Sequence, residues 1–319
     1  MKRETLVGWL VVAAALLLPM VVSSDVVLTI LVFSWLQGML AVSFNLIFGF
    51  TGQLSMFHAA AFGVAAYATH IGMQHLSLSY WSATVFAALL VAVLSVVVGT
   101  ICFRFRLKEF YFAVVTLAFS EMARLTVLNW NSVTNGSLGI NLQEKPFLWL
   151  PGMGEFKVDS TIAWYYLSLA ALGLTLLVCW RIVHSWMGRC FSAIRLNDEL
   201  GETLGINVFR YKLAAFVTGN FIAAIAGSLY AFYLGSIEPG FLSIDQSLGI
   251  VAMVLLGGRS SVAAPVAGAI LLTALPHVIH FSAEVRSMVY GAILILTILA
   301  MPQGIYGTAS RLMRGRHAA

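Results

Sequence analysis

Glu121 and Arg124 are the residues whose spacing most directly suggests chemistry, because opposite charges three positions apart share one face of a helix. The residues around them are mostly apolar, and charges in such surroundings usually pair with each other or face a water-filled cavity. The sequence leaves two interpretations open. Glu121 contacts a solute that passes along this helix, or the pair is structural and fixes helix packing.

Motifs that would make the chain an enzyme are missing from the sequence. It has no G-x-x-x-x-G-K-[S/T] phosphate loop, and its seven histidines show no metal-binding spacing. It also lacks a recognisable Ser/His/Asp or Cys/His set. The three cysteines form no C-x-x-C pair and are expected to be small buried residues: Cys102, Cys179 and Cys190. We therefore expect a non-catalytic chain without a cofactor or metal.

The composition places the chain in a membrane. Of its 319 residues, 60% are hydrophobic and only 10% are charged, and the mean hydropathy is +0.92. This composition excludes soluble domains, disordered chains and disulfide-stapled modules. No Asp, Glu, Lys or Arg occurs from Val26 to Phe103, which is enough for several helical crossings. The apolar runs are continuous rather than alternating, so the fold class is all-α and polytopic, not a β-barrel.

The sequence predicts about ten transmembrane helices, with eight as the lower count. Two segments, 54–73 and 244–258, could instead be broken or re-entrant, because one is rich in small residues and the other is short. The amino-terminal segment, 6–23, also resembles a signal peptide, but its length favours a retained helix. The predicted segments are 6–23, 26–48, 54–73, 79–103, 110–128, 161–182, 211–234, 244–258, 262–281 and 285–301.

The positions of the basic residues predict the orientation. With the amino terminus in the cytoplasm and ten crossings, most of the 18 lysines and arginines fall in short cytoplasmic segments. Both termini are then cytoplasmic, and residues 1–319 form a single transmembrane domain. No basic stripe interleaved with aromatic residues occurs, so nucleic acid is not an expected partner. Membrane lipid is.

Two connecting loops are longer than simple connections require. The external loop, 129–160, is rich in turn-forming residues, and its aromatic residues could lie at the membrane surface. It is either a docking surface for an external partner or a passive lid.

The cytoplasmic loop, 184–210, contains a predicted short amphipathic helix. Asn197 is a suitable first residue, Gly205 a suitable stop, and Leu196, Leu200 and Leu204 recur every four residues. This apolar stripe must be covered by lipid headgroups or by a protein. Anionic lipid would repel the acidic residues of the helix, so a protein partner is favoured. Those residues are Asp198, Glu199 and Glu202.

Four stretches of the sequence occur together in one known family. They are Asn45–Ser55 continuing through His58 to Tyr67, Phe110–Phe119 leading to Glu121, Gly188–Lys212, and Leu255–Gly268. In combination they resemble the LivM-type permeases of branched-chain amino acid ABC transporters. Three positions depart from the family pattern. Phe57 replaces the usual Gly before the histidine, and Ala263 and Ala264 replace the bulkier residue and the Gly that are expected before Pro265.

The resemblance implies a ten-helix or nearly ten-helix permease in the bacterial inner membrane. It implies three kinds of partner: a second permease subunit of LivH type, two cytoplasmic ATPase subunits, and a periplasmic substrate-binding protein. The predicted cytoplasmic helix then resembles the coupling helix that enters a groove of an ATPase. Its residues are Arg195, Asn197, Asp198, Glu199, Leu200, Leu204 and Gly205. Gln53, Ser55, His58 and Glu121 are the candidates for contacts along the translocation pathway.

The expected function is therefore import of leucine, isoleucine and valine, driven by ATP that partner subunits hydrolyse. An importer of the same type could instead carry urea, other amino acids or small organic acids. An ion-driven secondary transporter is the alternative from another class. It would need carboxylates near the bilayer centre, where the sequence offers little beyond Glu121.

Overall fold

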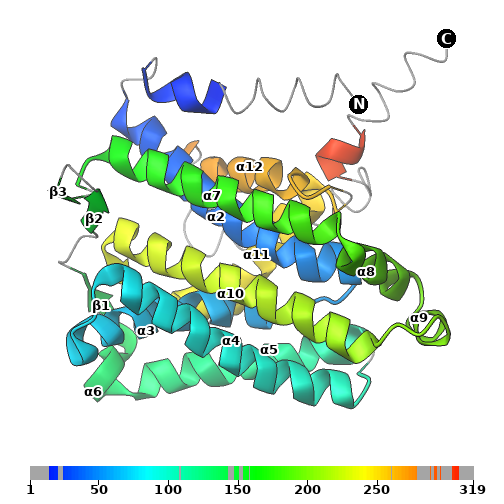
Figure 1. Ribbon diagram of the computed structural model, residues 1–319. Helices are drawn as coiled ribbons and strands as arrows, with labels where there is room; N and C mark the ends of the chain where they lie inside the picture. Colours follow the sequence, from blue (N-terminus) through cyan, green and yellow to red (C-terminus); the bar gives the residue numbers. More distant parts are fainter. Residues whose placement is uncertain are drawn as a thin grey trace, which may run out of the picture.

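The chain folds as a bundle of long helices with its irregular segments at the two ends. The computed structural model describes residues 14–20, 24–107, 109–142, 147–150, 154–157, 159–259, 261–278 and 304–308, with isolated positions at 288, 291, 292 and 295. Figure 1 shows the long helices side by side, with α6 (Asn131–Thr134) at one end and α8 (Trp186–Leu196) and α9 (Asp198–Thr203) at the other. We name these the α6 end and the α8–α9 end.

Five of the helices in the described part of the chain are long and apolar enough to cross a membrane: α2, α4, α5 from Phe110 onward, α7 and α10. Their ends lie within a few residues of the predicted segments. The helices of the bundle are α2 (Asp25–Thr51), α3 (Phe57–Leu76), α4 (Tyr80–Arg104), α5 (Glu109–Asn129), α7 (Thr161–Val183), α10 (Val208–Leu234), α11 (Ile244–Gly257) and α12 (Ala264–Val278).

The two segments of uncertain character have different outcomes. Segment 54–73 is non-helical at residues 54–56 and from Phe57 onward belongs to a continuous helix, α3, of 20 residues. Segment 244–258 is α11, with only 14 residues, and it is followed by α12. Apart from four isolated positions, the predicted helix 285–301 lies outside the described residues, as do the first half of the predicted helix 6–23 and both termini. The predicted total of ten crossings and the positions of the termini stay predictions.

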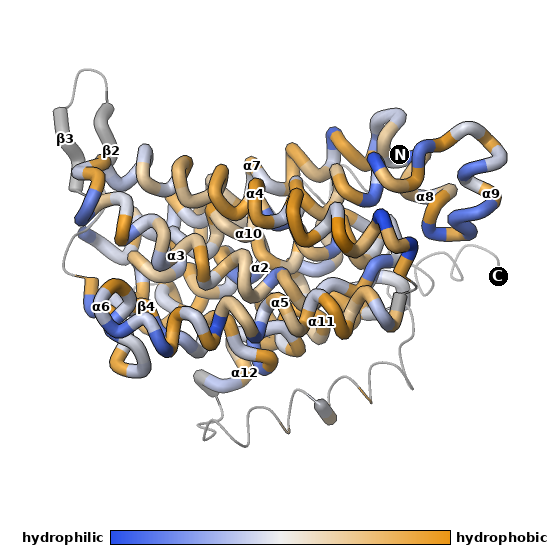
Figure 2. Tube along the Cα trace, turned by 90° about the horizontal axis from the view of Figure 1, so that it is seen from below, coloured by the Kyte–Doolittle hydropathy of each residue, from blue (hydrophilic) through white to orange (hydrophobic). Residues whose placement is uncertain are grey.

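The centre of the bundle is formed by α2, α3 and α10. In the most apolar part of α2, 67% of the residues are buried, against 28% in α5, which places α2 inside and α5 at the periphery. Figure 2 shows apolar residues along the helices and hydrophilic ones gathered around α8 and α9. Because α4, α5 and α7 keep apolar side chains on their outer faces, the outside of the bundle suits a lipid environment.

Small residues allow the central helices to approach closely. A Cβ atom at Gly227 of α10 would lie 2.0 Å from the backbone oxygen of Phe62 in α3. A Cβ at Gly63 of α3 would meet the side chain of Leu242 at 2.4 Å. Backbones this close need glycine, and such contacts are typical of helix pairs in membranes.

The loop before α7 contains strands that an all-α prediction does not include. β1 (Ile140–Asn141) pairs antiparallel with β4 (Ser236–Ile237), and β2 (Phe147–Leu150) pairs with β3 (Gly154–Lys157). A 3₁₀ turn, η1 (Gly136–Leu138), precedes β1, and another, η2 (Pro239–Leu242), follows β4. The predicted external loop is thus tied by backbone hydrogen bonds to the connection between α10 and α11.

The predicted cytoplasmic loop, 184–210, contains two helices: the predicted one, which is α9, and α8, which was not predicted. α8 ends at Leu196, and Asn197 takes an extended conformation and caps α9 by accepting hydrogen bonds from the N–H groups of Glu199 and Leu200. Gly205 follows with a positive φ of 78°, as its predicted stop role requires. The cap and the stop are therefore confirmed.

Candidate functional site

The link between α2 and α3 turns back into the bundle. α2 ends at Gly52, whose φ of 78° reverses the chain, and residues 52–56 lead to α3. In the first turn of α3, the His58 Nδ1 lies 2.8 Å from the Oδ1 of Asn220, which is near the middle of α10. The first turn of α3 therefore lies beside the middle of α10, not beside its end.

A second segment, between α10 and α11, enters the bundle from the α6 end. α10 ends at Gly235, and the chain then passes through β4 and η2 to Ile244, where α11 begins. In the first turn of α11, the Gln246 Nε2 donates a hydrogen bond of 3.5 Å to the Oε1 of Gln37, near the middle of α2. α11 is therefore a half-length helix that starts at about the mid-level of the bundle.

The two segments meet at Met56. The Met56 N–H donates to the hydroxyl of Thr116 on α5 at 3.0 Å, and the hydroxyl of Ser247 on α11 donates to the Met56 carbonyl at 3.2 Å. We call this meeting point, with segments 52–56 and 238–247, the junction. Interrupted helices at mid-depth are the usual setting for solute sites in transporters. The sequence suggests the irregularity near 54 and 244, but nothing in it identifies Thr116 or Ser247 as partners.

The predicted pathway residues Gln53, Ser55 and His58 are all buried at this junction. Both ring nitrogens of His58 are in hydrogen-bonding contact, with Asn220 and, at 2.9 Å, with the hydroxyl of Ser43 on α2. The Ser55 hydroxyl accepts a hydrogen bond from the N–H of Phe57. All three side chains are buried, and His58 connects α2, α3 and α10.

Glu121 lies apart from these three residues, on the partly exposed face of α5. Arg124 Nε donates to both Glu121 carboxylate oxygens, at 3.0 and 2.8 Å. The predicted ion pair is therefore present. Both charges are matched within one helix, as the structural interpretation of the pair requires.

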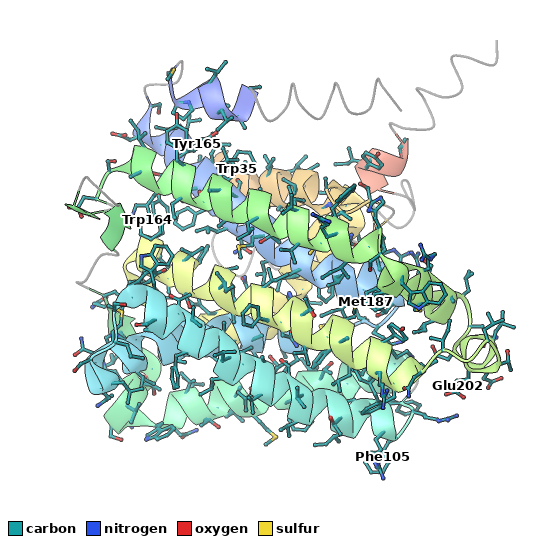
Figure 3. The ribbon with its side chains drawn as sticks, in the orientation of Figure 1. Trp35, Phe105, Trp164, Tyr165, Met187 and Glu202 are labelled. Atoms are coloured by element: carbon teal, nitrogen blue, oxygen red, sulfur yellow. The ribbon has the colours of Figure 1, made fainter. Side chains whose placement is uncertain are left out.

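At the α8–α9 end, hydrogen bonds and ion pairs attach α8 and α9 to the bundle. Arg195 donates a hydrogen bond of 2.6 Å to the carbonyl of Gly49 in α2, and Lys212 of α10 pairs with Asp198. Arg106, after α4, pairs with Glu202 at 3.2 Å. Figure 3 shows Glu202 on α9 and Phe105 beyond α4 at this same end. These groups surround a cleft of about 1080 Å³.

The leucines of the predicted stripe point away from the protein. Leu196, Leu200 and Leu204 are all strongly exposed, although they lie next to a well-anchored polar framework. They do not form the predicted stripe on one helix, because Leu196 ends α8, only Leu200 lies within α9, and Leu204 follows it. Uncovered apolar side chains on fixed helices are still typical of a protein contact surface. Among the described residues, no group of three His, Cys, Asp or Glu side chains could hold a metal ion.

Comparison with known proteins decides the family. The family model described as "Branched-chain amino acid transport system / permease component" matches residues 26–298. The chain belongs to this family. Its match runs from α2 through the junction and the α8–α9 end to beyond α12, so both candidate regions are part of the family fold.

Individual relatives agree with this family assignment. The chain is 30% identical over 218 residues to the high-affinity branched-chain amino acid permease LivM of Salmonella typhimurium, covering 63% of this chain and 51% of LivM. It is 32% identical over 190 residues to LivH of the same organism, covering 56% and 59%. It is 35% identical over 119 residues to the xylose permease XylH of Escherichia coli, covering 35% and 30%. The matched region thus spans about half the length of these LivM and LivH relatives.

Proposed function

We propose that the chain is a permease subunit of an ATP-driven importer of branched-chain amino acids in the bacterial inner membrane. The family match over residues 26–298 carries this proposal. The LivM and LivH relatives are named as permeases of high-affinity branched-chain amino acid transport, and their cargo is the one we assign to this chain.

The charge distribution supports an orientation with the α8–α9 end in the cytoplasm. Basic residues gather there, at the ends of α4, α7 and α8 and the start of α10, as the positive-inside rule requires. Fewer basic residues belong to the α6 end: Arg124 lies about one turn before the end of α5, and the loop before α7 contains Lys145 and Lys157. The basic residues of the α8–α9 end are Arg104, Arg106, Arg181, Arg189, Arg195, Arg210, Lys212 and Arg259.

In this orientation each end of the bundle has a proposed partner. α9 and its exposed leucines enter a groove of one of two ATPase subunits, and the strand-bearing α6 end receives a periplasmic binding protein. A second permease subunit of LivH type forms the other wall of the pathway. ATP binding closes the ATPases, α9 follows that motion, and the junction changes access from one side to the other.

The test is co-purification followed by transport. The tagged chain is isolated from native membranes in mild detergent, and its partners are identified by mass spectrometry. The recovered complex is placed in proteoliposomes, and uptake of radiolabelled leucine is measured with ATP, and again with ATP plus an uncoupler. We expect two ATPases, a second permease and uptake that survives the uncoupler. A chain recovered alone, or uptake that the uncoupler abolishes, would contradict the proposal.

The cargo is tested in the same vesicles. Unlabelled valine and isoleucine should compete with leucine, whereas urea, small organic acids and xylose should not. Competition by one of the latter group alone would assign the importer to another cargo.

A further inference from the structure

Segment 52–56 presents alternate side chains to the inside and the outside of the chain. Gln53 and Ser55 are buried, whereas Leu54 and Met56 are only half-buried. Burial therefore alternates from residue to residue along 53–56. The polar members of the segment thus face the core, and the apolar members reach the surface at the mid-level of the bundle.

α11 continues the same apolar surface. Ser247 faces Met56, and the helical rotation per residue places Ile244 and Leu248 about 60° and about 100° from it, on a single flank. Both side chains are well exposed, Ile244 at 45% and Leu248 at 37%. Four apolar side chains, two from each segment, therefore border the junction on its outer side.

The protein backbone at this surface is irregular, and lipid is therefore an unsuitable cover for it. Among the residues that the structure describes, nothing pairs with the N–H and C=O groups of Leu54. Irregular backbone at membrane depth occurs only where protein buries it or where it lines a water-filled cavity. The Gln53 Oε1 and the hydroxyl of Ser120, one turn beyond Thr116 on α5, are also buried without a partner in the described residues. Water or a polar ligand would satisfy these groups.

We infer that Leu54, Met56, Ile244 and Leu248 form the wall that contacts the aliphatic side chain of the cargo as it passes between this chain and the second permease subunit. The inference rests on the proposed function, and it names the residues that act in it. The flexible thioether of Met56 can adapt to differently branched side chains. The backbone groups of Leu54, which have no partner in the described residues, leave a place for water around the zwitterionic end of an amino acid.

Cysteine accessibility tests the inference in the intact complex. Cys102, Cys179 and Cys190 are buried, so the unmodified chain gives a low background. Single cysteines are introduced as Gln53→Cys, Leu54→Cys, Ser55→Cys and Met56→Cys and treated with a hydrophilic methanethiosulfonate, which reacts with water-exposed thiolates. Leu89→Cys, on the exposed apolar face of α4, supplies the lipid-facing reference.

We expect positions 54 and 56 to react at least about tenfold faster than 53, 55 and 89, because only water-exposed thiols ionise readily. Leucine delivered by the binding protein should slow both reactions. Equal reactivity at all four positions of the segment, or no reaction at 54 and 56, would overturn the inference. Each variant is first shown to co-purify with its partners, so that misfolding is recognised.

A second variant separates this inference from the proposed function. Met56→Trp should block leucine uptake, whereas Met73→Ala, at a half-buried methionine further along α3, should leave uptake unchanged. If the unmodified complex does not import leucine, the proposed function fails. If it imports leucine and Met56→Trp does so equally well, only the inference fails.

Discussion

Lys212 is almost fully buried in α10 and forms its ion pair with Asp198, the first residue of α9. Its side chain is only 6% exposed, whereas that of Asp198 is 49% exposed. A buried ammonium group needs a partner, because the loss of hydration is otherwise uncompensated. The position of α9 is therefore linked to α10, one of the central helices of the bundle.

Asp198→Asn should destabilise the chain through this pair. It leaves the Lys212 charge buried without its partner. Breaking a fully buried pair costs about 3–5 kcal/mol, and because Asp198 is half-exposed we expect a loss of about 3 kcal/mol or less in the free energy of unfolding. Thermal unfolding of the purified complex measures the change. Glu202→Gln is the matched control, because the Arg106–Glu202 pair is exposed, 78% and 42%, and should contribute no more than about 1 kcal/mol. Equal effects of the two variants would contradict the prediction.

Leu200→Asp should release the ATPase from the complex. A carboxylate among the exposed leucines would have to be desolvated in an apolar groove, which is strongly unfavourable. Co-purification should then recover the second permease without the ATPase. Leu138→Asp changes an even more exposed leucine at the α6 end and should leave the ATPase bound. Retention of the ATPase by Leu200→Asp would exclude α9 as its contact.

Glu121→Gln should leave leucine uptake intact. The carboxylate is held by Arg124 within α5, so a role limited to helix packing predicts a decrease in stability of about 1 kcal/mol or less. Initial uptake rates in proteoliposomes distinguish the two interpretations of the sequence. The double variant Glu121→Gln/Arg124→Gln removes both charges and should also transport. Loss of uptake in both variants would instead place Glu121 on the pathway.

Gly227→Ala should be destabilising and Gly173→Ala should not. At Gly227 the new Cβ would collide with the backbone of α3, and relief of such overpacking typically costs about 1–3 kcal/mol. At Gly173 of α7 no atom lies within 4 Å of the new Cβ, and alanine is the better helix former by about 0.5–1 kcal/mol. Midpoints of thermal unfolding should therefore move in opposite directions.

The positions of the helices could be predicted from the sequence, because charges are excluded from membrane spans and mark their ends. Segment 161–182 differs by one residue from α7, and the cap at Asn197 and the stop at Gly205 follow from local backbone chemistry. The Glu121–Arg124 pair was also predictable, since both residues lie on one helix.

The junction could not be predicted in the same way. Its contacts join residues far apart in the chain, such as Thr116 with Met56 and Ser247 with Met56. A serine or threonine in an apolar span usually bonds to the carbonyl four residues earlier, and the sequence does not distinguish those that bond elsewhere. The sequence likewise does not indicate that the ring nitrogens of His58, a predicted pathway residue, contact Ser43 and Asn220.

The pairing of β1 with β4 gives the α6 end a direct mechanical connection to the centre of the bundle. Ile140 is held to Ile237 by strand hydrogen bonds, and only η2 separates β4 from the first turn of α11. A protein that pushed or pulled on the loop before α7 would therefore move the entrance of α11 through the backbone itself. A protein bound at the α6 end could therefore shift Met56 through the backbone, without any change in side-chain packing between the long helices.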